Sequence, residues 1–285
     1  MCGAGIVVLL IALWAARSEI ARRRGLAKMA ALANACFALP LAVFGALHLA
    51  DVGMVAPGVP SYMPWKLFWA YFVGAALVAA GLSIAAKVWV RWSGPLFGIM
   101  MFLFVAMMEF QGALAKPGDR FGWTFVVREI SFGVGGWILA GSAMGGKGGS
   151  RLITLGRVIV AVTALFYGVE HFLHPEGALG VPLEKATAAW IPGRLLIGYL
   201  TGVILVIAGG FMLVGKETRR AATYLGTWIV LVVLLIYGPM MIAALRDPSV
   251  GAEIEGINYF ADTLLFAGAV LALADAETDA DERLA

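Results

Sequence analysis

Three histidines are the residues of this sequence best suited to bind a ligand or a metal ion. His48 and His171 each follow a glycine by three residues near the end of an apolar segment, and His174 lies one helical turn after His171. Two imidazoles in equivalent positions could ligate a haem or a metal ion. Glu170 and the two histidines after it do not match the zinc-protease pattern, whose histidines lie four residues apart around a glutamate. Because a histidine also caps the carboxyl end of a helix, we favour capping over metal binding.

Other ionisable side chains fall inside apolar segments, where each costs about 2.5–3.5 kcal/mol on insertion into a membrane. They gather toward one side of the predicted membrane. With two tyrosines, the candidate ligand-binding residues are His48, Lys66, Tyr71, Glu109, Arg128, Glu129, Glu170, His171, His174, Arg194, Tyr199 and Asp262. A quinone-type site, with histidine or tyrosine bonded to a carbonyl between apolar walls, is one interpretation of this layer.

The alternative interpretation of this layer is structural. Long basic side chains near a helix end can extend to the interface, and Glu129 beside Arg128 and Glu109 could form an ion pair between helices. Carboxylates are too short to extend in this way, so Glu109 and Glu129 are the strongest functional candidates.

The segments that carry these residues are long and apolar. Hydrophobic residues make up 61% of the 285 and charged residues only 14%, with a mean hydropathy of +0.90, whereas a soluble domain carries about 25% charge. Apolar runs of about 20 residues are long enough to cross about 30 Å of hydrocarbon. Backbone groups in lipid must be bonded within a helix or a closed barrel, and these runs are too long for barrel strands. The sequence predicts an all-α, polytopic transmembrane bundle.

Eight membrane spans are predicted, with boundaries near 29–50, 66–86, 95–115, 123–143, 153–173, 194–214, 223–244 and 258–275. A shorter apolar stretch, Gly3 to Ala16, precedes them and is followed by basic residues. This order is the reverse of that in a cleaved signal peptide. We therefore expect a short hydrophobic helix there, which either crosses the membrane or lies at its interface.

The distribution of lysine and arginine predicts the orientation. Thirteen of them lie on one side of the predicted membrane and six on the other, so the first side is expected to be cytoplasmic. The loops 51–65 and 174–193 then face outward, and the acidic tail 276–285 is a solvated, disordered cytoplasmic end. These features are typical of a bacterial-type cytoplasmic (inner) membrane protein.

Similar residues recur at similar spacings in the two halves of the chain. Gly45 and His48 match Gly168 and His171, and an aromatic residue stands two before a proline, Pro64 or Pro192, in each half. Counted from these prolines, the further matches are Lys66 with Arg194, Tyr71 with Tyr199, Gly74 with Gly202 and Gly81 with Gly209. Met107-Met108 with Met240-Met241 and Glu129 with Asp262 extend the comparison.

These matches predict a tandem repeat of a four-helix unit. An even number of helices brings both copies in from the same side, which makes a parallel repeat. The expected organisation is a hydrophobic segment and basic linker at 1–28, repeats at 29–143 and 153–275, and the tail at 276–285.

A helix that ends in Gly-x-x-His, an outer loop, an aromatic-x-Pro entry and a helix with tyrosine and spaced glycines resembles the DoxX-like family of membrane proteins. The resemblance covers 29–143 and again 153–275. It implies the four-helix fold and an accessory or ligand-binding subunit, for quinone or lipid, within a quinone-linked redox system. A small-molecule transporter, a haem or metal redox enzyme, and a purely structural subunit of a larger membrane complex are the alternatives.

Other functional classes are disfavoured by the sequence. The net charge of +3 comes without a basic stripe, which argues against nucleic acid as a partner. The two cysteines, Cys2 and Cys36, form no C-x-x-C motif and support no disulfide framework.

Overall fold

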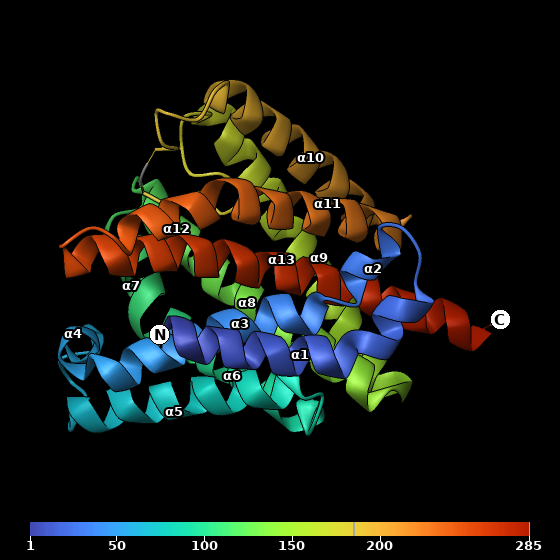
Figure 1. Ribbon diagram of the computed structural model, residues 1–285, viewed down its shortest axis with the longest axis horizontal. Coiled ribbons are helices and arrows are strands. Elements are labelled where there is room, and N and C mark those ends of the chain that lie inside the picture. The colour runs from blue at the N-terminus through green and yellow to red at the C-terminus, as the bar shows by residue number, and fades with distance from the viewer. Residues whose placement is uncertain (185, 285) are drawn as a thin grey trace.

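The computed structural model describes residues 1–184 and 186–284, with side chains described up to residue 277. Within these residues the fold is built from helices alone, and no strand is formed. Figure 1 shows the long helices lying side by side along the longest axis of the molecule. We call the two ends of this bundle the α4 end and the α2 end, after the short helices that lie there.

The α-helices of the described chain differ widely in length. They are α1 (Cys2–Arg22), α2 (Ala27–Ala30), α3 (Ala33–Ala50), α4 (Val52–Val55), α5 (Lys66–Ala85), α6 (Val90–Phe104), α7 (Phe110–Ala115), α8 (Arg120–Met144), α9 (Gly146–Leu173), α10 (Arg194–Val214), α11 (Thr218–Val232), α12 (Gly238–Ala244) and α13 (Val250–Leu284). A 3₁₀ turn, η1 (Ala56–Gly58), follows α4, and the π-helical turns η2 (Val105–Glu109) and η3 (Val233–Tyr237) continue α6 and α11.

Eight helices of the described chain are long and apolar enough to cross a membrane. This confirms the predicted all-α, multi-pass architecture. The set includes α1, whose 21 residues run past Ala16 to Arg22. Figure 1 shows α1 lying along α3 and α5 like the other long helices. Its length and position favour a membrane-crossing helix over an interfacial one.

The helix α8, which corresponds to the predicted span 123–143, is not among those eight. Arg128 and Glu129 lower its hydropathy. Its 25 residues nevertheless correspond to about 37 Å of helix, enough to cross the hydrocarbon. Because α8 packs between α6, α9 and α13, its charged residues face protein rather than lipid, and we infer that it crosses with its neighbours.

The helix α13 differs from expectation at both ends. It begins at Val250 rather than near 258, and its backbone stays helical to Leu284. The backbone of the tail from residue 276, where disorder was predicted, is thus drawn as a continuation of this helix. Alanine, glutamate, leucine and arginine, which are strong helix formers, are frequent there, so the tail extends the preceding span.

The pairing of helices follows one pattern in the two halves. The helix α3 packs on α5 as α9 packs on α10, and α6 packs on α8 as α11 packs on α13. Across the halves, α3 packs on α13 and α9 packs on α8, while α8 and α13 meet at the centre.

The lengths of these elements also agree between the halves. The starts of α5, α6 and η2 at residues 66, 90 and 105 are each followed 128 residues later by those of α10, α11 and η3, at 194, 218 and 233. With this interval Met107 is equivalent to Leu235 in the second half, and not to Met240 as the paired methionines suggested.

Glycines allow the closest helix approaches in both halves. A Cβ added at Gly45 would lie 2.7 Å from Val78 and 2.8 Å from the Gly74 carbonyl oxygen. A Cβ added at Gly168 would meet Val206 and the Gly202 carbonyl in the same way. Small residues at such positions let backbones touch in lipid, where tight packing replaces the hydrophobic effect between helices.

Candidate functional site at the α4 end

A buried group of three charged residues joins α8 to α13. The Arg128 Nη1 donates to Asp262 Oδ2 at 2.9 Å, and its Nη2 donates to Glu129 Oε1 at 2.9 Å. The side chains of Arg128, Glu129 and Asp262 are 16%, 15% and 9% exposed. The ion pair expected between Arg128 and Glu129 is thus present, but Asp262 makes the connection between helices. We call these three residues the ionic triad.

Two cavities lie on either side of the ionic triad and share Arg128, Asn258 and Asp262 in their walls. One, of about 480 Å³, has polar walls and is also lined by Glu109 and Glu184. The other, of about 250 Å³, is mostly apolar and contains Glu129. Glu109 thus lines the polar cavity, without an ion-pair partner among the described residues.

A third cavity, of about 250 Å³, lies between α3, α5 and α6 beneath the segment 51–65. We call it the His48 cavity. Its walls are almost wholly apolar and include four methionines, Met63, Met100, Met107 and Met108. Methionine side chains adapt to ligands of irregular shape. His48 and Phe104 also line the apolar cavity beside the ionic triad. The His48 cavity and this apolar cavity are therefore neighbours.

Two residues that line the His48 cavity, His48 and Trp69, each carry a ring nitrogen without a hydrogen-bond partner among the described residues. The His48 Nδ1 bonds to the Phe44 carbonyl oxygen at 2.8 Å, and Nε2 has no hydrogen-bond partner among the described residues. The Trp69 Nε1 is buried and likewise lacks a partner there. A buried polar group left without a partner costs about 1–3 kcal/mol, which a ligand atom in the cavity would recover.

His171 has the same backbone contact as His48 but a different environment. Its Nδ1 bonds to the Tyr167 carbonyl oxygen at 2.6 Å, and its Nε2 accepts a hydrogen bond from the Gly180 backbone N–H at 3.0 Å. Residues 178–181 of the following loop are buried against it. Both ring nitrogens of His171 are therefore occupied, whereas its counterpart His48 keeps one for a ligand, cofactor or metal.

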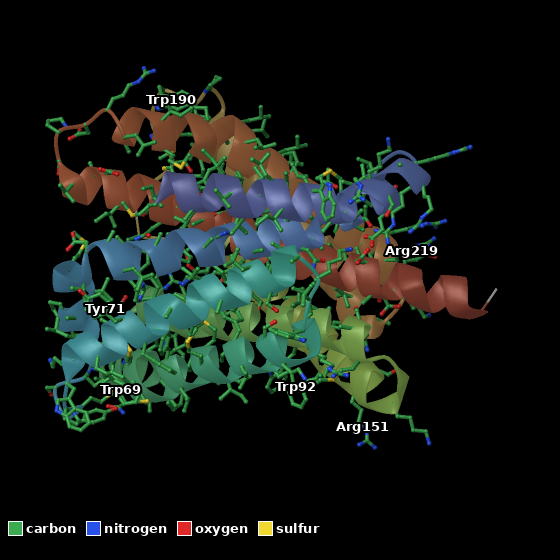
Figure 2. All side chains as sticks on the ribbon, turned by 60° about the horizontal axis from the view of Figure 1, so that its bottom comes forward. Trp69, Tyr71, Trp92, Arg151, Trp190 and Arg219 are labelled. Atoms are coloured by element: carbon green, nitrogen blue, oxygen red, sulfur yellow. The ribbon has the colours of Figure 1, made fainter. Side chains whose placement is uncertain are left out.

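The remaining predicted site residues lie apart from the His48 cavity. Glu170 bonds to Arg120 at 2.8 Å, Arg194 donates to the Thr187 carbonyl oxygen at 3.1 Å, and His174 lies 3.9 Å from Glu176. Tyr71 and Tyr199 are 47% and 45% exposed on the outside of the bundle, and Lys66 is half-buried. Figure 2 shows Trp69 and Tyr71 at the α4 end, far from Arg151 and Arg219. The polar layer is thus several separate environments rather than one site.

No family model, no curated protein and no solved structure matches this chain. The candidate site therefore rests on its geometry.

Trp69 and Gly180 are the site residues that sequence reasoning missed. Nothing in the sequence distinguishes Trp69 from the eight other tryptophans, because its importance lies in an indole N–H buried without a partner. Gly180 gave a weak signal, since an isolated glycine in a loop often marks a left-handed backbone, and its φ is indeed +81°.

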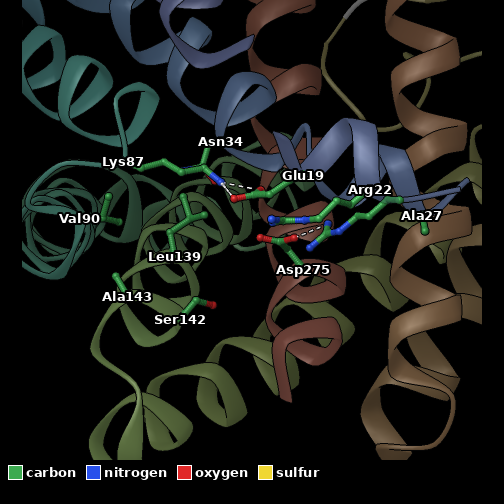
Figure 3. A pocket seen from close by; sticks show the side chains of 11 residues that line it. Glu19, Arg22, Ala27, Asn34, Lys87, Val90, Leu139, Ser142, Ala143 and Asp275 are labelled. Atoms are coloured by element: carbon green, nitrogen blue, oxygen red, sulfur yellow. Dashed lines mark hydrogen bonds and ion pairs between the residues drawn. The ribbon is translucent and has the colours of Figure 1, made fainter. Parts of the chain in front are cut away.

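A larger cavity, of about 710 Å³, lies at the α2 end (Figure 3). Lys87 Nζ contacts Glu19 Oε1 at 2.6 Å, and Arg23 Nη1 contacts Asp275 Oδ1 at 2.5 Å. These pairs tie the end of α1 to the α5–α6 turn and to α13. We interpret the ion pairs that line this cavity as structural contacts that attach the end of α1 to the bundle.

Proposed function

We propose that this protein binds an apolar small molecule, of quinone or lipid type, in the His48 cavity, and serves as a ligand-binding or accessory subunit of a membrane redox system. The observation that carries the proposal is an apolar cavity lined by His48 and Trp69, whose ring nitrogens Nε2 and Nε1 have no hydrogen-bond partner among the described residues. Small-molecule sites are mostly apolar with a few placed polar groups, and this cavity has that character.

The position of the cavity supports a lipophilic ligand. Phe72 and Leu103 line it and are also exposed on the outside of the bundle, where a membrane protein meets hydrocarbon. A molecule dissolved in the bilayer could therefore reach the cavity sideways, without crossing water.

The wider identity of the protein is part of the same proposal. The matched helix lengths, helix pairs and glycine contacts support a tandem repeat of a four-helix unit. The proposal that this unit is DoxX-like rests on the sequence resemblance alone. We propose that the protein lies in a bacterial-type inner membrane. Its α2 end then faces the cytoplasm, because the basic residues gather there.

This orientation makes a direct prediction. A reporter enzyme that works only in the cytoplasm should be active when fused after residue 285 and inactive when inserted in the segment 51–65. The reverse pattern would place the α4 end in the cytoplasm.

Extraction of the purified protein tests the binding proposal. We expect organic extracts of the wild type to contain one enriched lipophilic species in near-equal amount to the protein. Met100→Trp should lose it, because Met100 lines the cavity and the larger tryptophan side chain would occupy part of the space that the ligand needs. In the second half, 128 residues later, Trp228 stands at this place.

The matched control is Leu96→Trp, which adds the same side chain to α6 at a position that is 64% exposed. It should keep the species. The binding proposal would be rejected if wild-type extracts held only bulk lipid, or if Met100→Trp retained the same species.

A small-molecule transporter is the second candidate. The π-helical turns η2 and η3 interrupt the long helices at matched places, and such turns are frequent at functional sites. Parallel repeats are also a transporter architecture. Flux of a candidate substrate in proteoliposomes above that in empty vesicles would favour this alternative, and its absence would count against it.

A further inference from the structure

The hydrogen-bond pattern of His48 limits the chemistry of its ligand. The Phe44 carbonyl oxygen can only accept a hydrogen bond, so the Nδ1 that contacts it at 2.8 Å carries the proton. In a neutral imidazole the other nitrogen is then an acceptor. His48 Nε2 is therefore an acceptor, and a ligand that bonds to it must supply the donor.

His171 shows what such an imidazole binds in this fold. Its Nδ1 contacts the Tyr167 carbonyl oxygen, and the donor that reaches its Nε2 is the Gly180 backbone N–H at 3.0 Å. The carbonyl of the same peptide, that of Leu179, accepts from the Tyr237 hydroxyl at 2.8 Å. The loop thus presents one donor and one acceptor from a single planar group.

This loop segment is closely fitted into its place. Leu179 is fully buried, and a Cβ at Gly180 would lie 3.0 Å from Thr263 and 3.3 Å from Ile229. The Cβ atoms of the two histidines are packed alike, because Gly202 packs on the Cβ of His171 as Gly74 packs on the Cβ of His48. In the first half no backbone N–H of the described chain donates to His48 Nε2.

Trp69 also lines the His48 cavity, and its ring nitrogen has the opposite requirement. An indole N–H is a donor only, so the buried Trp69 Nε1 needs an acceptor. A hydroxyl group provides both, because its hydrogen donates and its oxygen lone pairs accept. A ketone or an ether oxygen could satisfy Trp69 and would leave His48 without a donor.

We propose that the ligand of the His48 cavity carries a hydroxyl group, as a phenol or an alcohol with an apolar body, and donates it to His48 Nε2. This inference rests on the proposed function, since it names the class of molecule that the same cavity binds. It assigns His48 the selection of the head group and Trp69 the binding of its oxygen.

Two probes that differ in one group test the inference. A para-alkylphenol and its methyl ether share the same apolar body and the same oxygen acceptor, but only the phenol can donate. With the full-length protein in nanodiscs and calorimetry as the measurement, we expect the phenol to bind the wild type about tenfold more tightly than the ether.

Variants separate the roles of the two side chains. His48→Phe should remove the preference, so that both probes bind equally. Trp69→Phe should weaken both probes by a similar factor and keep their ratio. His174→Phe, a histidine outside the cavity, should behave like the wild type.

The outcomes distinguish this inference from the function on which it rests. If both probes bind the wild type equally, or if the ether binds more tightly, the hydroxyl assignment is overturned and the cavity remains a binding site. If neither probe binds, the binding function itself fails and the hydroxyl assignment fails with it. A preference that survives in His48→Phe would show that another residue selects the head group.

Discussion

Arg128→Met should lower the free energy of unfolding by about 3–5 kcal/mol, the usual cost of removing one partner from a buried ion pair. Arg128 neutralises two carboxylates, those of Glu129 and Asp262, at 2.9 Å each. Without it, two like charges remain side by side with little access to water. The expected result is a marked fall in the melting temperature of the detergent-purified protein, followed by circular dichroism.

Two further variants make this experiment specific. Arg120→Met breaks the ion pair with Glu170. Because the Arg120 side chain is 27% exposed, this change should lower the free energy of unfolding clearly less than Arg128→Met. Neutralising the whole ionic triad, with Arg128→Met, Glu129→Gln and Asp262→Asn together, should restore much of the loss, because no buried charge is left unpaired. An Arg128→Met protein that melts like the wild type would show that the ionic triad does not hold α8 to α13.

Gly268→Ala should destabilise the bundle by about 1–3 kcal/mol, the range found when a close contact is overfilled. A Cβ at this position would lie 2.6 Å from the backbone nitrogen of Phe37 and 2.8 Å from its Cα. Backbone atoms cannot turn aside as a side chain can, so α13 and α3 must separate. The same thermal measurement in detergent reports the change.

Gly210→Ala is the matched control, since Gly210 also lies within a long helix and nothing comes within 4 Å of its added Cβ. Alanine is the better helix former by about 1 kcal/mol, so this variant should be unchanged or slightly more stable. Equal melting temperatures for the two variants would contradict the close packing of α3 on α13.

The membrane architecture could be predicted because its cause is local. Long apolar runs must become helices in lipid, and the predicted spans correspond to the long helices from α3 to α13. The limits of α1 were missed because the apolar run stops at Ala16, whereas the helix continues through charged residues. Glu19 in that extension pairs with Lys87, 68 residues away, which a local pattern does not show.

The candidate site was predicted less completely, because its parts come from distant segments. Arg128 and Glu129 are adjacent in the sequence, but Asp262 lies 134 residues from Arg128. His48 and His171 were correctly seen as similar, since both contact a carbonyl one turn earlier. What makes them different is the loop at Gly180, and the fit of a loop into a cavity depends on tertiary packing.

The asymmetry between the two histidines explains why a binding site would survive in one half alone. Around His171, Gly180 supplies the donor, and Trp228 stands where Met100 lies in the first half. Around His48, methionines and a partnerless indole N–H leave room for a ligand. Under the proposed function, the Gly180 N–H takes the place of a ligand donor beside His171, whereas the His48 cavity stays open to a ligand.

An experimental density map of the protein, purified in nanodiscs with its native lipids, would show directly whether the His48 cavity holds a ligand. We expect elongated non-protein density in the cavity, with its polar end within hydrogen-bond distance of His48 Nε2 and its body along Met100. A cavity closed by its own side chains, or filled with water alone, would contradict it.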